Sequence, residues 1–280
     1  MYWFGDDLYE LYLPLKQETS ETIAEIEFLT EVIGGLKYKD YVLGKTFDKE
    51  KRNLIKKIIK ERVTSGRPIQ QIVGKAYFCG EIFLVNEKTL IPRPETELII
   101  ECLKKYFSAE DNFKMLEIGT GTGCISIMTA KIFKNAHITG TDICQQCIDI
   151  SQKNARLHNE EENTDFILSD LFENVLEKYD VIVSNPPYIS LADVNSVQEN
   201  VLRYEPHSAL FAPDNGYYFY KKIISESFNY IKQNSVLIFE LGINQAKKVS
   251  DFFEKNKFAD IRIIKDFNNI DRVISATYHS

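Results

Sequence analysis

Apolar residues recur at intervals of three and four positions in two segments near the start of the chain, residues 20–36 and residues 48–65. This spacing places apolar side chains on one face of an amphipathic helix. Glycines stand at the ends of both segments, as is typical where helices stop. No pattern typical of a strand occurs before residue 70. We therefore predict that residues 1–75 form a small helical domain.

The pattern changes over residues 76–91, where aromatic and β-branched residues dominate and Asn86-Glu87 lies in the middle. Two such runs around a polar centre are typical of a β-hairpin. The segment that follows, "PRPETE", is expected to start a helix, because Pro94 suits a first-turn position. We therefore predict a β-hairpin linker over residues 76–95.

After residue 110, continuous apolar runs alternate with helical segments, which is typical of a doubly wound α/β sheet covered on both faces. The short link "DFNNID" between the last two runs permits a hairpin, so we expect an antiparallel last strand. We predict a Rossmann-like, seven-stranded α/β domain over residues 96–280. The expected strands are Lys114–Ile118, His137–Thr141, Asp165–Leu168, Asp180–Ser184, Ser235–Glu240, Ala259–Lys265 and Arg272–Tyr278.

The composition is that of a globular protein, because 44% of the 280 residues are apolar and can fill a core. No apolar run approaches the ~20 residues that cross a bilayer. The first residues lack the basic and apolar regions of a secretory signal. The five cysteines have no repeating spacing, which suits reduced thiols. We expect a cytoplasmic protein that does not contact membranes.

The net charge of −7 argues against a dedicated nucleic-acid binder, which is usually basic. The charge is unevenly spread, however. Residues 1–36 carry one Lys and eight acidic residues, whereas residues 37–67 carry eleven Lys or Arg and four acidic residues. The basic segment has two interpretations. It is a solvated helix surface, or it faces an RNA-rich or acidic partner.

Glycines at positions 119, 121 and 123 lie where the first strand of the expected sheet turns into a helix. Such glycines let backbone N–H groups approach a ligand closely. Asp142 closes the second strand, 23 residues after Gly119, where an acid accepts hydrogen bonds from ribose hydroxyls. NAD and S-adenosylmethionine both present a ribose at this position.

Two features favour S-adenosylmethionine over NAD. Glu117 precedes the glycine-rich loop, where it can bind a cationic amino group. Asp170 follows the third strand, where it can face the adenine amino group while Leu171 or Phe172 packs on the ring. The predicted cofactor site comprises Glu117, Gly119, Thr120, Gly121, Thr122, Gly123, Asp142, Ile143, Asp170, Leu171, Phe172 and Asn185.

The sequence Asn185-Pro186-Pro187-Tyr188 follows the fourth strand, at the edge of the sheet where ligands bind in open α/β folds. The prolines stiffen this loop and remove two N–H donors. The Asn185 side-chain oxygen and the Pro186 carbonyl can accept both hydrogens of a planar –NH₂ group, and Tyr188 can pack on its plane. We predict that these four residues are catalytic and bind the substrate. Glutamine and adenine both present such a group.

Cys144 and Cys147 are spaced as in zinc or redox motifs. A zinc site needs about four ligands, and neither a second cysteine pair nor a suitably spaced histidine is present in the sequence. We expect ordinary packing for these thiols and no metal.

From about Gly66 onward the sequence resembles the release-factor glutamine N5-methyltransferase family, a group of class I S-adenosylmethionine-dependent methyltransferases. "LIPRPETE" is the most discriminating segment of this resemblance. The other similar segments are "GRPIQQIVGKAYFCGEIFLVNEKT", "EIGTGTG", "SNPPYI", "EPHSALFA", "FELGINQ" and the final "DRV".

The resemblance implies methyl transfer to the side-chain amide of the Gln in the Gly-Gly-Gln motif of class-1 peptide chain release factors. S-adenosylmethionine is the implied methyl donor and S-adenosylhomocysteine the product. Arg93, Pro94 and Glu95 are implied to lie in a substrate-binding loop over the site. The helical domain is implied to dock the release factor. We expect a monomer, because a one-to-one complex of enzyme and substrate needs no oligomer, and the acidic net charge leads us to expect no direct nucleic-acid contact.

Two other functions are weighed against this one. The first is N6-adenine methylation of RNA or DNA, because adenine offers the same planar amino group. The acidic net charge argues against it, since a flipped base needs a basic channel. The second is a non-catalytic cofactor-binding adaptor that acts through the basic helical segment. The intact Asn185 and Asp142 argue against that alternative.

Overall fold

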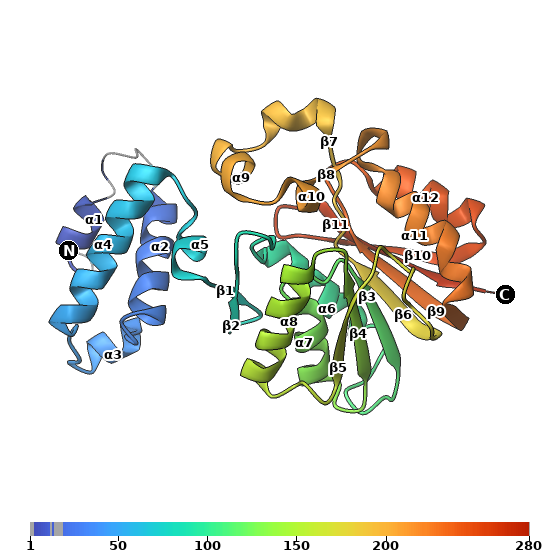
Figure 1. Cartoon of the computed structure of the whole chain (residues 1–280), viewed down its shortest axis with the longest axis horizontal. Helices are drawn as coiled ribbons and strands as arrows, with labels where there is room; N and C mark the ends of the chain where they lie inside the picture. Colours follow the sequence, from blue (N-terminus) through green and yellow to red (C-terminus); the bar gives the residue numbers. More distant parts are fainter. Residues whose placement is uncertain (1–2, 12, 14–18, 280) are drawn as a thin grey trace. The chain divides into compact units, whose positions relative to one another are not determined.

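The chain divides into two compact units, Met1–Gly74 and Lys75–Ser280 (Figure 1). The structure is a computed structural model, and it describes residues 3–11, 13 and 19–279.

The first unit is built from helices over its described residues: α1 (Asp6–Glu10), α2 (Thr19–Val32), α3 (Tyr38–Val42), α4 (Lys49–Ser65) and α5 (Ile69–Val73). The helices expected in residues 20–36 and 48–65 correspond to α2 and α4. Their apolar faces supply Ile26, Leu29, Ile55 and Ile59 to a buried core. Helix α4 ends at Gly66, which adopts the left-handed conformation that glycine tolerates without strain.

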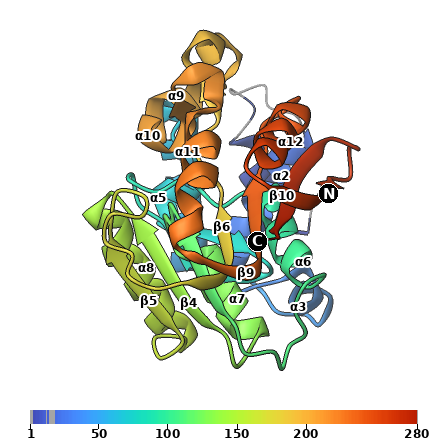
Figure 2. The same cartoon turned by 90° about the vertical axis from the view of Figure 1, so that its right-hand side faces the viewer.

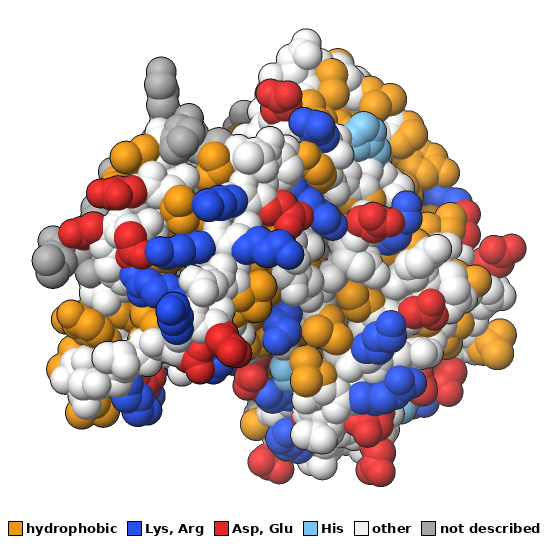
Figure 3. Space-filling model, turned by 60° about the vertical axis from the view of Figure 1, so that its left-hand side comes forward, with side chains coloured by type: hydrophobic (Ala, Val, Ile, Leu, Met, Phe, Trp, Pro, Cys, Tyr) orange, Lys and Arg blue, Asp and Glu red, His pale blue; other side chains and the backbone are white. Residues whose placement is uncertain are grey.

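The uneven charge of the first 67 residues is partly balanced inside this unit. Asp7 pairs with Arg52 and with Lys56, at 2.7 Å for the lysine, and Glu25 pairs with Arg62 at 3.1 Å. Each pair joins an acid of the acidic segment to a cation of the basic one. Figure 3 likewise shows Lys and Arg side chains with Asp and Glu side chains among them on the face in view. Part of the basic segment therefore neutralises its own unit.

A short antiparallel hairpin, β1 (Lys75–Phe78) and β2 (Glu81–Leu84), begins the second unit. Its turn lies at Cys79-Gly80, so the expectation that Asn86-Glu87 forms the centre of the hairpin was wrong. Cys79 and Gly80 both have positive φ angles, 50° and 76°. Positive angles at both central positions belong to the two-residue type I′ turn that matches the twist of paired strands.

The main sheet has seven strands in the order β10-β11-β9-β6-β3-β4-β5. Strands β3, β4, β5, β6 and β9 run parallel, whereas β11 is antiparallel to both of its neighbours, β9 and β10. The predicted Rossmann-like sheet with an antiparallel last strand is therefore confirmed. The bounds are β3 (Lys114–Ile118), β4 (His137–Asp142), β5 (Thr164–Leu168), β6 (Tyr179–Ser184), β9 (Ile231–Glu240), β10 (Phe258–Lys265) and β11 (Asp271–Tyr278).

Helices cover both faces of this sheet, as Figure 2 shows. Val181 and Val183 of β6 pack into a core with residues of α6, α7 and α8, while Ile182 between them packs into a second core with residues of α11 and α12. This alternation follows from the two-residue period of a strand. The helix bounds are α6 (Glu97–Leu103), α7 (Cys124–Ile132), α8 (Gln145–His158), α11 (Tyr218–Glu226) and α12 (Ala246–Lys255).

Between β6 and α11 the chain forms an irregular segment in which β7 (Ile189–Ser190) pairs in parallel with β8 (Phe211–Ala212). Its short helices are η3 (Leu191–Ser196), α9 (Glu199–Tyr204), α10 (His207–Leu210) and η4 (Asp214–Gly216), and two further single turns elsewhere are η2 (Pro94–Thr96) and η5 (Ser227–Asn229). In the described part of the chain, no helix has the length and apolar character that crossing a membrane requires.

Candidate active site

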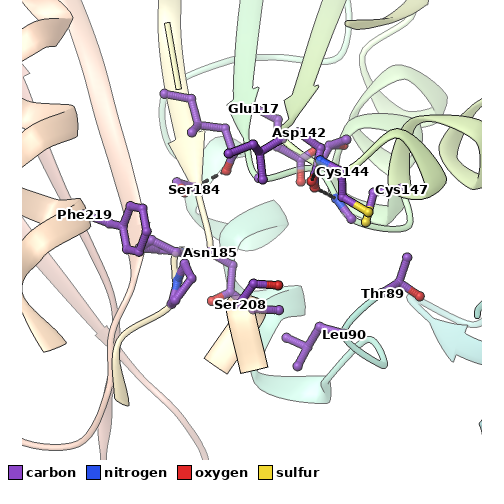
Figure 4. A pocket seen from close by; sticks show the side chains of 18 of the residues that line it. Thr89, Leu90, Glu117, Asp142, Cys144, Cys147, Ser184, Asn185, Ser208 and Phe219 are labelled. Atoms are coloured by element: carbon purple, nitrogen blue, oxygen red, sulfur yellow. Dashed lines mark hydrogen bonds between the residues drawn. The ribbon is translucent and has the colours of Figure 1, made fainter. Parts of the chain in front are cut away.

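A cavity of about 440 Å³ lies beyond the carboxyl ends of the parallel strands of the second unit. The chain leaves β3 and β6 in opposite directions along the sheet, so the cavity lies at the topological switch point where open α/β sheets bind ligands. Its volume suits a small molecule. Figure 4 shows Glu117, Asp142 and Asn185 around this space. The predicted residues that line it are Arg93, Glu117, Gly119, Thr120, Gly121, Thr122, Asp142, Ile143, Asp170, Leu171, Asn185, Pro186 and Pro187.

The glycine-rich loop turns sharply after β3. The backbone N–H groups of Gly119 and Thr120 both donate to the carbonyl of Thr141, each at 2.8 Å, which fastens the loop to the end of β4. A Cβ atom on Gly119 would meet nothing within 4 Å, whereas one on Gly123 would lie 2.9 Å from Cβ of Ser151. The first glycine therefore leaves room on the cavity side, and Gly123, which does not line the cavity, lets the loop pack on α8.

Glu117 is 1% exposed, and its carboxylate accepts every hydrogen bond from the described residues on one oxygen. The hydroxyl of Thr120 donates to Oε2 at 2.8 Å, and Ser126 donates to the same atom through its hydroxyl and through its backbone N–H at 3.1 Å. Burial raises the pKa of Glu117 to about 7. Oε1 has no donor among the described residues, and it belongs to a residue that lines the cavity.

Asp142, at the end of β4, is fixed by two backbone donors. Oδ2 accepts from Gly121 N–H at 2.9 Å, and Oδ1 accepts from Cys144 N–H at 2.9 Å. Burial raises the pKa of Asp142 above its ordinary value. Both carboxylate oxygens retain lone pairs for a ligand. Ile143 beside it is 67% exposed, and Asp170 is exposed after β5.

Leu171 and Phe172 point to different places. Leu171 lines the cavity and has a positive φ of 49°. Phe172 is 2% exposed and stacks on Tyr230 at a centroid distance of 4.6 Å, within the core under α11. The expectation that Phe172 contacts the cofactor is therefore contradicted, because its ring is used in the core. Leu171 is the apolar residue that the loop turns toward the cavity.

Asn185 lies where two cavities adjoin. It lines the large one and also a smaller one of about 140 Å³, which Tyr188 and Arg93 line as well. Its Nδ2 donates to Oγ1 of Thr96 at 3.2 Å, while Oδ1 accepts no hydrogen bond from the described residues. The Ser184 hydroxyl donates to the Ile118 carbonyl at 2.7 Å, which ties the end of β6 to β3. Asn185 is thus presented from a fixed strand end.

Tyr188 lines the smaller cavity but not the larger one. Its hydroxyl donates to Oε1 of Glu240 at 3.2 Å, and its backbone carbonyl accepts from Nε2 of Gln245 at 3.0 Å. Burial and the Glu240 carboxylate raise the pKa of Tyr188 above its ordinary value. The Tyr188 hydroxyl therefore stays protonated, and its hydrogen bond to Glu240 fixes the ring.

Arg93 is also held by another side chain. Its guanidinium donates to Oε1 of Glu205, whose side chain is 1% exposed, and Oε2 of Glu205 accepts from Ile91 N–H at 3.2 Å. This pair fastens the "LIPRPETE" segment to the "EPHSALFA" segment. Pro94 and Glu95 line neither cavity, so the structure does not bring them to the site with Arg93.

The Cys144 and Cys147 side chains both line the cavity, and Cys147 Sγ donates to the Lys88 carbonyl at 3.3 Å. Over the described residues, no group of three or more His, Cys, Asp or Glu side chains is arranged to hold a metal ion.

Comparison with known proteins decides the family. Residues 94–209 match the model of the "Methyltransferase small domain". A release factor glutamine methyltransferase of Streptococcus pneumoniae is 34% identical over 260 residues, which cover 91% of each chain. Another, from Fusobacterium nucleatum, is 38% identical over 239 residues, covering 84% of this chain and 67% of the relative. The chain belongs to the release factor glutamine methyltransferase family.

Solved structures support the fold of this family member. The hMettl16 catalytic domain in complex with MAT2A 3′UTR hairpin 1 is 13% identical, covers 91% of this chain and 92% of its own, and has a TM-score of 0.58. At this identity the likeness concerns the fold alone.

S-adenosylmethionine is the methyl donor of this family, and the residues around the larger cavity fit it. A carboxylate oxygen of Glu117 is free to bind an ammonium group. The acceptor pair of Asp142 suits a diol, and the apolar Leu171 and Ile143 suit a ring.

Sequence reasoning missed Thr96 and Glu240. Glu240 is the last residue of β9, is 2% exposed and does not line the cavity. Its Oε2 accepts from the Thr96 hydroxyl at 2.5 Å, and its Oε1 accepts from Tyr188. An acid that closes a continuous apolar strand, as in "VLIFEL", was the signal that could have found it.

Proposed function

We propose that this protein transfers the methyl group of S-adenosylmethionine to the side-chain amide nitrogen, N5, of the Gln in the Gly-Gly-Gln motif of class-1 peptide chain release factors. The observation that carries the proposal is the orientation of Asn185. Its Nδ2 is bound to Thr96, which leaves Oδ1 as an acceptor at the junction of the two cavities. The relatives named release factor glutamine methyltransferase support the choice of glutamine.

On the cofactor side, S-adenosylmethionine supplies an electrophilic methyl carbon attached to a sulfonium sulfur. We assign Glu117 Oε1 to its amino group, the loop from Gly119 to Gly123 to its amino-acid portion, and Asp142 to its ribose. Asp170, Leu171 and Ile143 are assigned to the adenine. These assignments rest on the lining of the larger cavity and on the free acceptors described above.

On the substrate side, Asn185 Oδ1 and the Pro186 carbonyl each accept one N–H of the glutamine amide. No described residue donates to either acceptor, so both are available. An amide nitrogen is a weak nucleophile because its lone pair is delocalised. Fixing both N–H bonds turns the nitrogen toward the methyl carbon, so the rate gain comes from orientation and electrostatics.

The methyl transfer exchanges one covalent bond for another. One N–C bond forms, the C–S bond of the methyl donor breaks, and S-adenosylhomocysteine is the product. The methylated amide nitrogen then loses one proton to water. A strong general base is not required, and Tyr188, whose pKa is raised by burial, acts through its ring and not as a base.

We further propose that the helical unit docks the release factor and that one copy of the enzyme suffices for the reaction. Because release factors act in the cytoplasm, we also propose that the enzyme acts there. Lys57 and Lys60 of α4 are exposed, and neither pairs with an acid among the described residues. Replacing both by Glu should raise the KM for the release factor several-fold. The KM for S-adenosylmethionine should stay unchanged. Equal KM values for the factor would contradict this docking role.

The central test uses labelled S-adenosylmethionine with a release factor, ribosomal RNA or DNA as acceptor. We expect label in the release factor and none after Gln→Ala in its Gly-Gly-Gln motif. Label that survives this substitution would overturn the choice of glutamine. Label in nucleic acid would restore the adenine alternative, which the relatives do not favour.

A further inference from the structure

Three side chains from distant parts of the chain form a hydrogen-bonded relay behind the amide site. Glu240 Oε2 accepts from the Thr96 hydroxyl at 2.5 Å, and Thr96 Oγ1 accepts from Asn185 Nδ2 at 3.2 Å. Thr96 and Glu240 are buried; Glu240 lines neither cavity, Thr96 lines the larger one, and Asn185 lines both. The relay therefore runs from the core to the substrate side.

The direction of these bonds is set by the carboxylate. An ionised carboxylate can only accept hydrogen bonds, and a hydroxyl has a single hydrogen to donate. Because Thr96 gives that hydrogen to Glu240, its oxygen can only accept from Asn185. An amide that must donate toward Thr96 turns its Nδ2 inward and its Oδ1 outward. In the reverse orientation, Asn185 would offer N–H groups to a substrate –NH₂, which cannot accept them.

The same carboxylate also holds the last residue of the Asn-Pro-Pro-Tyr sequence. Tyr188 donates to Glu240 Oε1 at 3.2 Å, so each oxygen of Glu240 receives one hydroxyl hydrogen. Tyr220 donates to the backbone carbonyl of Glu240 at 2.8 Å, which fixes the end of β9. Glu95 and Arg272 are the charged residues whose fields act on this carboxylate.

We propose that Glu240 and Thr96 are positioning residues that keep the Asn185 oxygen, and not its nitrogen, turned toward the substrate amide. This inference rests on the proposed glutamine methylation and deepens it. It makes the preference for an amide over a carboxylate substrate depend on Glu240, which lines neither cavity, and on Thr96, which lies between Glu240 and Asn185.

Thr96→Val tests the relay, since it keeps the shape of Thr96 and removes the hydroxyl. We expect kcat to fall about tenfold or more, the scale of leaving a buried polar group unpaired. Thr96 lines the larger cavity, but the residues assigned to the cofactor are Glu117, the glycine-rich loop and Asp142, so the dissociation constant for S-adenosylhomocysteine should stay within about twofold. Thr96→Ser retains both hydrogen bonds and should restore kcat to within about threefold of the original.

A second readout separates positioning from a purely structural role. The release factor is prepared with Gln→Glu and with Gln→Ala in its Gly-Gly-Gln motif, and both are used as competitive inhibitors. Against the unaltered enzyme, the Glu form should inhibit less well than the Ala form, because its carboxylate meets two acceptors. In Thr96→Val the Asn185 amide is free to turn, so this preference should shrink about tenfold or reverse.

Thr129→Val is the matched control. Thr129 is buried, and its hydroxyl donates to the Ile125 carbonyl at 2.7 Å within α7. This variant should leave both kcat and the inhibitor preference unchanged. Glu240→Gln provides a second variant of the relay, because its amide can donate to Thr96 and so removes the fixed direction. It should show the same two changes as Thr96→Val.

The outcomes distinguish the two proposals. If the unaltered enzyme does not methylate the release factor at all, the proposed function fails. If it does, and folded Thr96→Val keeps its kcat and its preference for the Ala form over the Glu form, the positioning role is overturned and the function stands. A drop in kcat without a change in inhibitor preference would also overturn it, because a structural defect alone would produce that result.

Discussion

Two buried carboxylates lie in the two halves of the proposed active site, Glu117 on the proposed cofactor side and Glu240 on the proposed amide side. Both lie at the carboxyl ends of sheet strands, and burial raises the pKa of each to about 7. They differ in how their oxygens are used. Glu117 gathers its donors on Oε2 and leaves Oε1 at the cavity, whereas Glu240 receives a hydroxyl on each oxygen and lies outside the cavity.

We infer from this difference that Glu117 binds a ligand, whereas Glu240 positions other side chains of the protein. A buried charge is costly unless it is paired or fully hydrogen-bonded. The Glu117 carboxylate lacks a hydrogen-bond donor for Oε1 among the described residues, so this oxygen fits a cationic group of the cofactor. Glu240 has its donors within the protein and in return fixes their orientation.

Asn185→Ala removes the end point of the Glu240 relay. We expect kcat to fall by roughly 10²-fold or more, the scale seen when a preorganised site group is lost. Affinity for S-adenosylhomocysteine should stay within about tenfold, because Glu117 and Asp142 are untouched. Steady-state kinetics and calorimetry measure both quantities. Near-normal turnover would mean that the amide receptor is wrongly placed.

Glu117→Gln should affect the opposite half of the site. We expect S-adenosylhomocysteine to bind about 10-fold to 100-fold more weakly, because a charged hydrogen bond to its ammonium group is lost. 5′-Methylthioadenosine has no amino-acid portion and should bind both enzymes equally. Glu240→Gln is the control and should change neither affinity. Equal weakening of both ligands would show that Glu117 supports the pocket instead of binding the amino group.

The pH dependence should separate the two acids. Protonation of Glu240, whose pKa is about 7, frees the direction of the relay. We therefore expect kcat with both substrates saturating to fall as the pH drops below about 7, by roughly tenfold at one unit lower. The ionisation of Glu117 should appear instead in the pH dependence of kcat/KM for S-adenosylmethionine, because kcat/KM reports the ionisation of groups in the free enzyme. A kcat that is flat between about pH 6 and about pH 8 would contradict the Glu240 assignment.

Glu117 also affects the stability of the protein without ligand. The folded-state pKa of Glu117 is raised from 4.5 to about 7, so the stability it contributes is fully present below pH 4.5 and is lost as the pH rises through 7. Glu117→Gln removes this loss. At about pH 8 the free energy of unfolding should rise by up to about 3 kcal/mol, as measured by denaturant unfolding. A decrease at that pH would show that the carboxylate is already compensated within the protein.

Much of the fold follows from local sequence patterns. The strands between Lys114 and Tyr278 could be located because buried parallel strands are continuous apolar runs separated by helices. The positions of Gly119, Asp142 and Asn185 at one edge of the sheet followed from the rule that parallel strands end on the same side. The comparison with relatives agrees with the family that the motifs indicated.

Local sequence patterns did not predict which way individual side chains point. Leu171 and Phe172 are neighbours of similar apolar character, and only the backbone turn with a positive φ at Leu171 sends one to the cavity and the other to Tyr230. The hairpin turn lies at Cys79-Gly80, and not at the expected Asn86-Glu87, for a related reason. Positive φ at Cys79 is imposed by strand pairing, and its side chain does not favour it.

The sequence by itself determined the elements, their alternation and the chemistry at each strand end, because these depend on short-range periodicity and residue type. Only the tertiary structure decided that Thr96, Asn185 and Glu240 meet. Thr96 and Glu240 are 144 residues apart, and the strand order places the end of β9, with Glu240, beside the end of β6, which precedes Asn185. No short sequence pattern predicts the direction of hydrogen bonds that connect three residues so far apart in the chain, because these bonds form only once the sheet has formed.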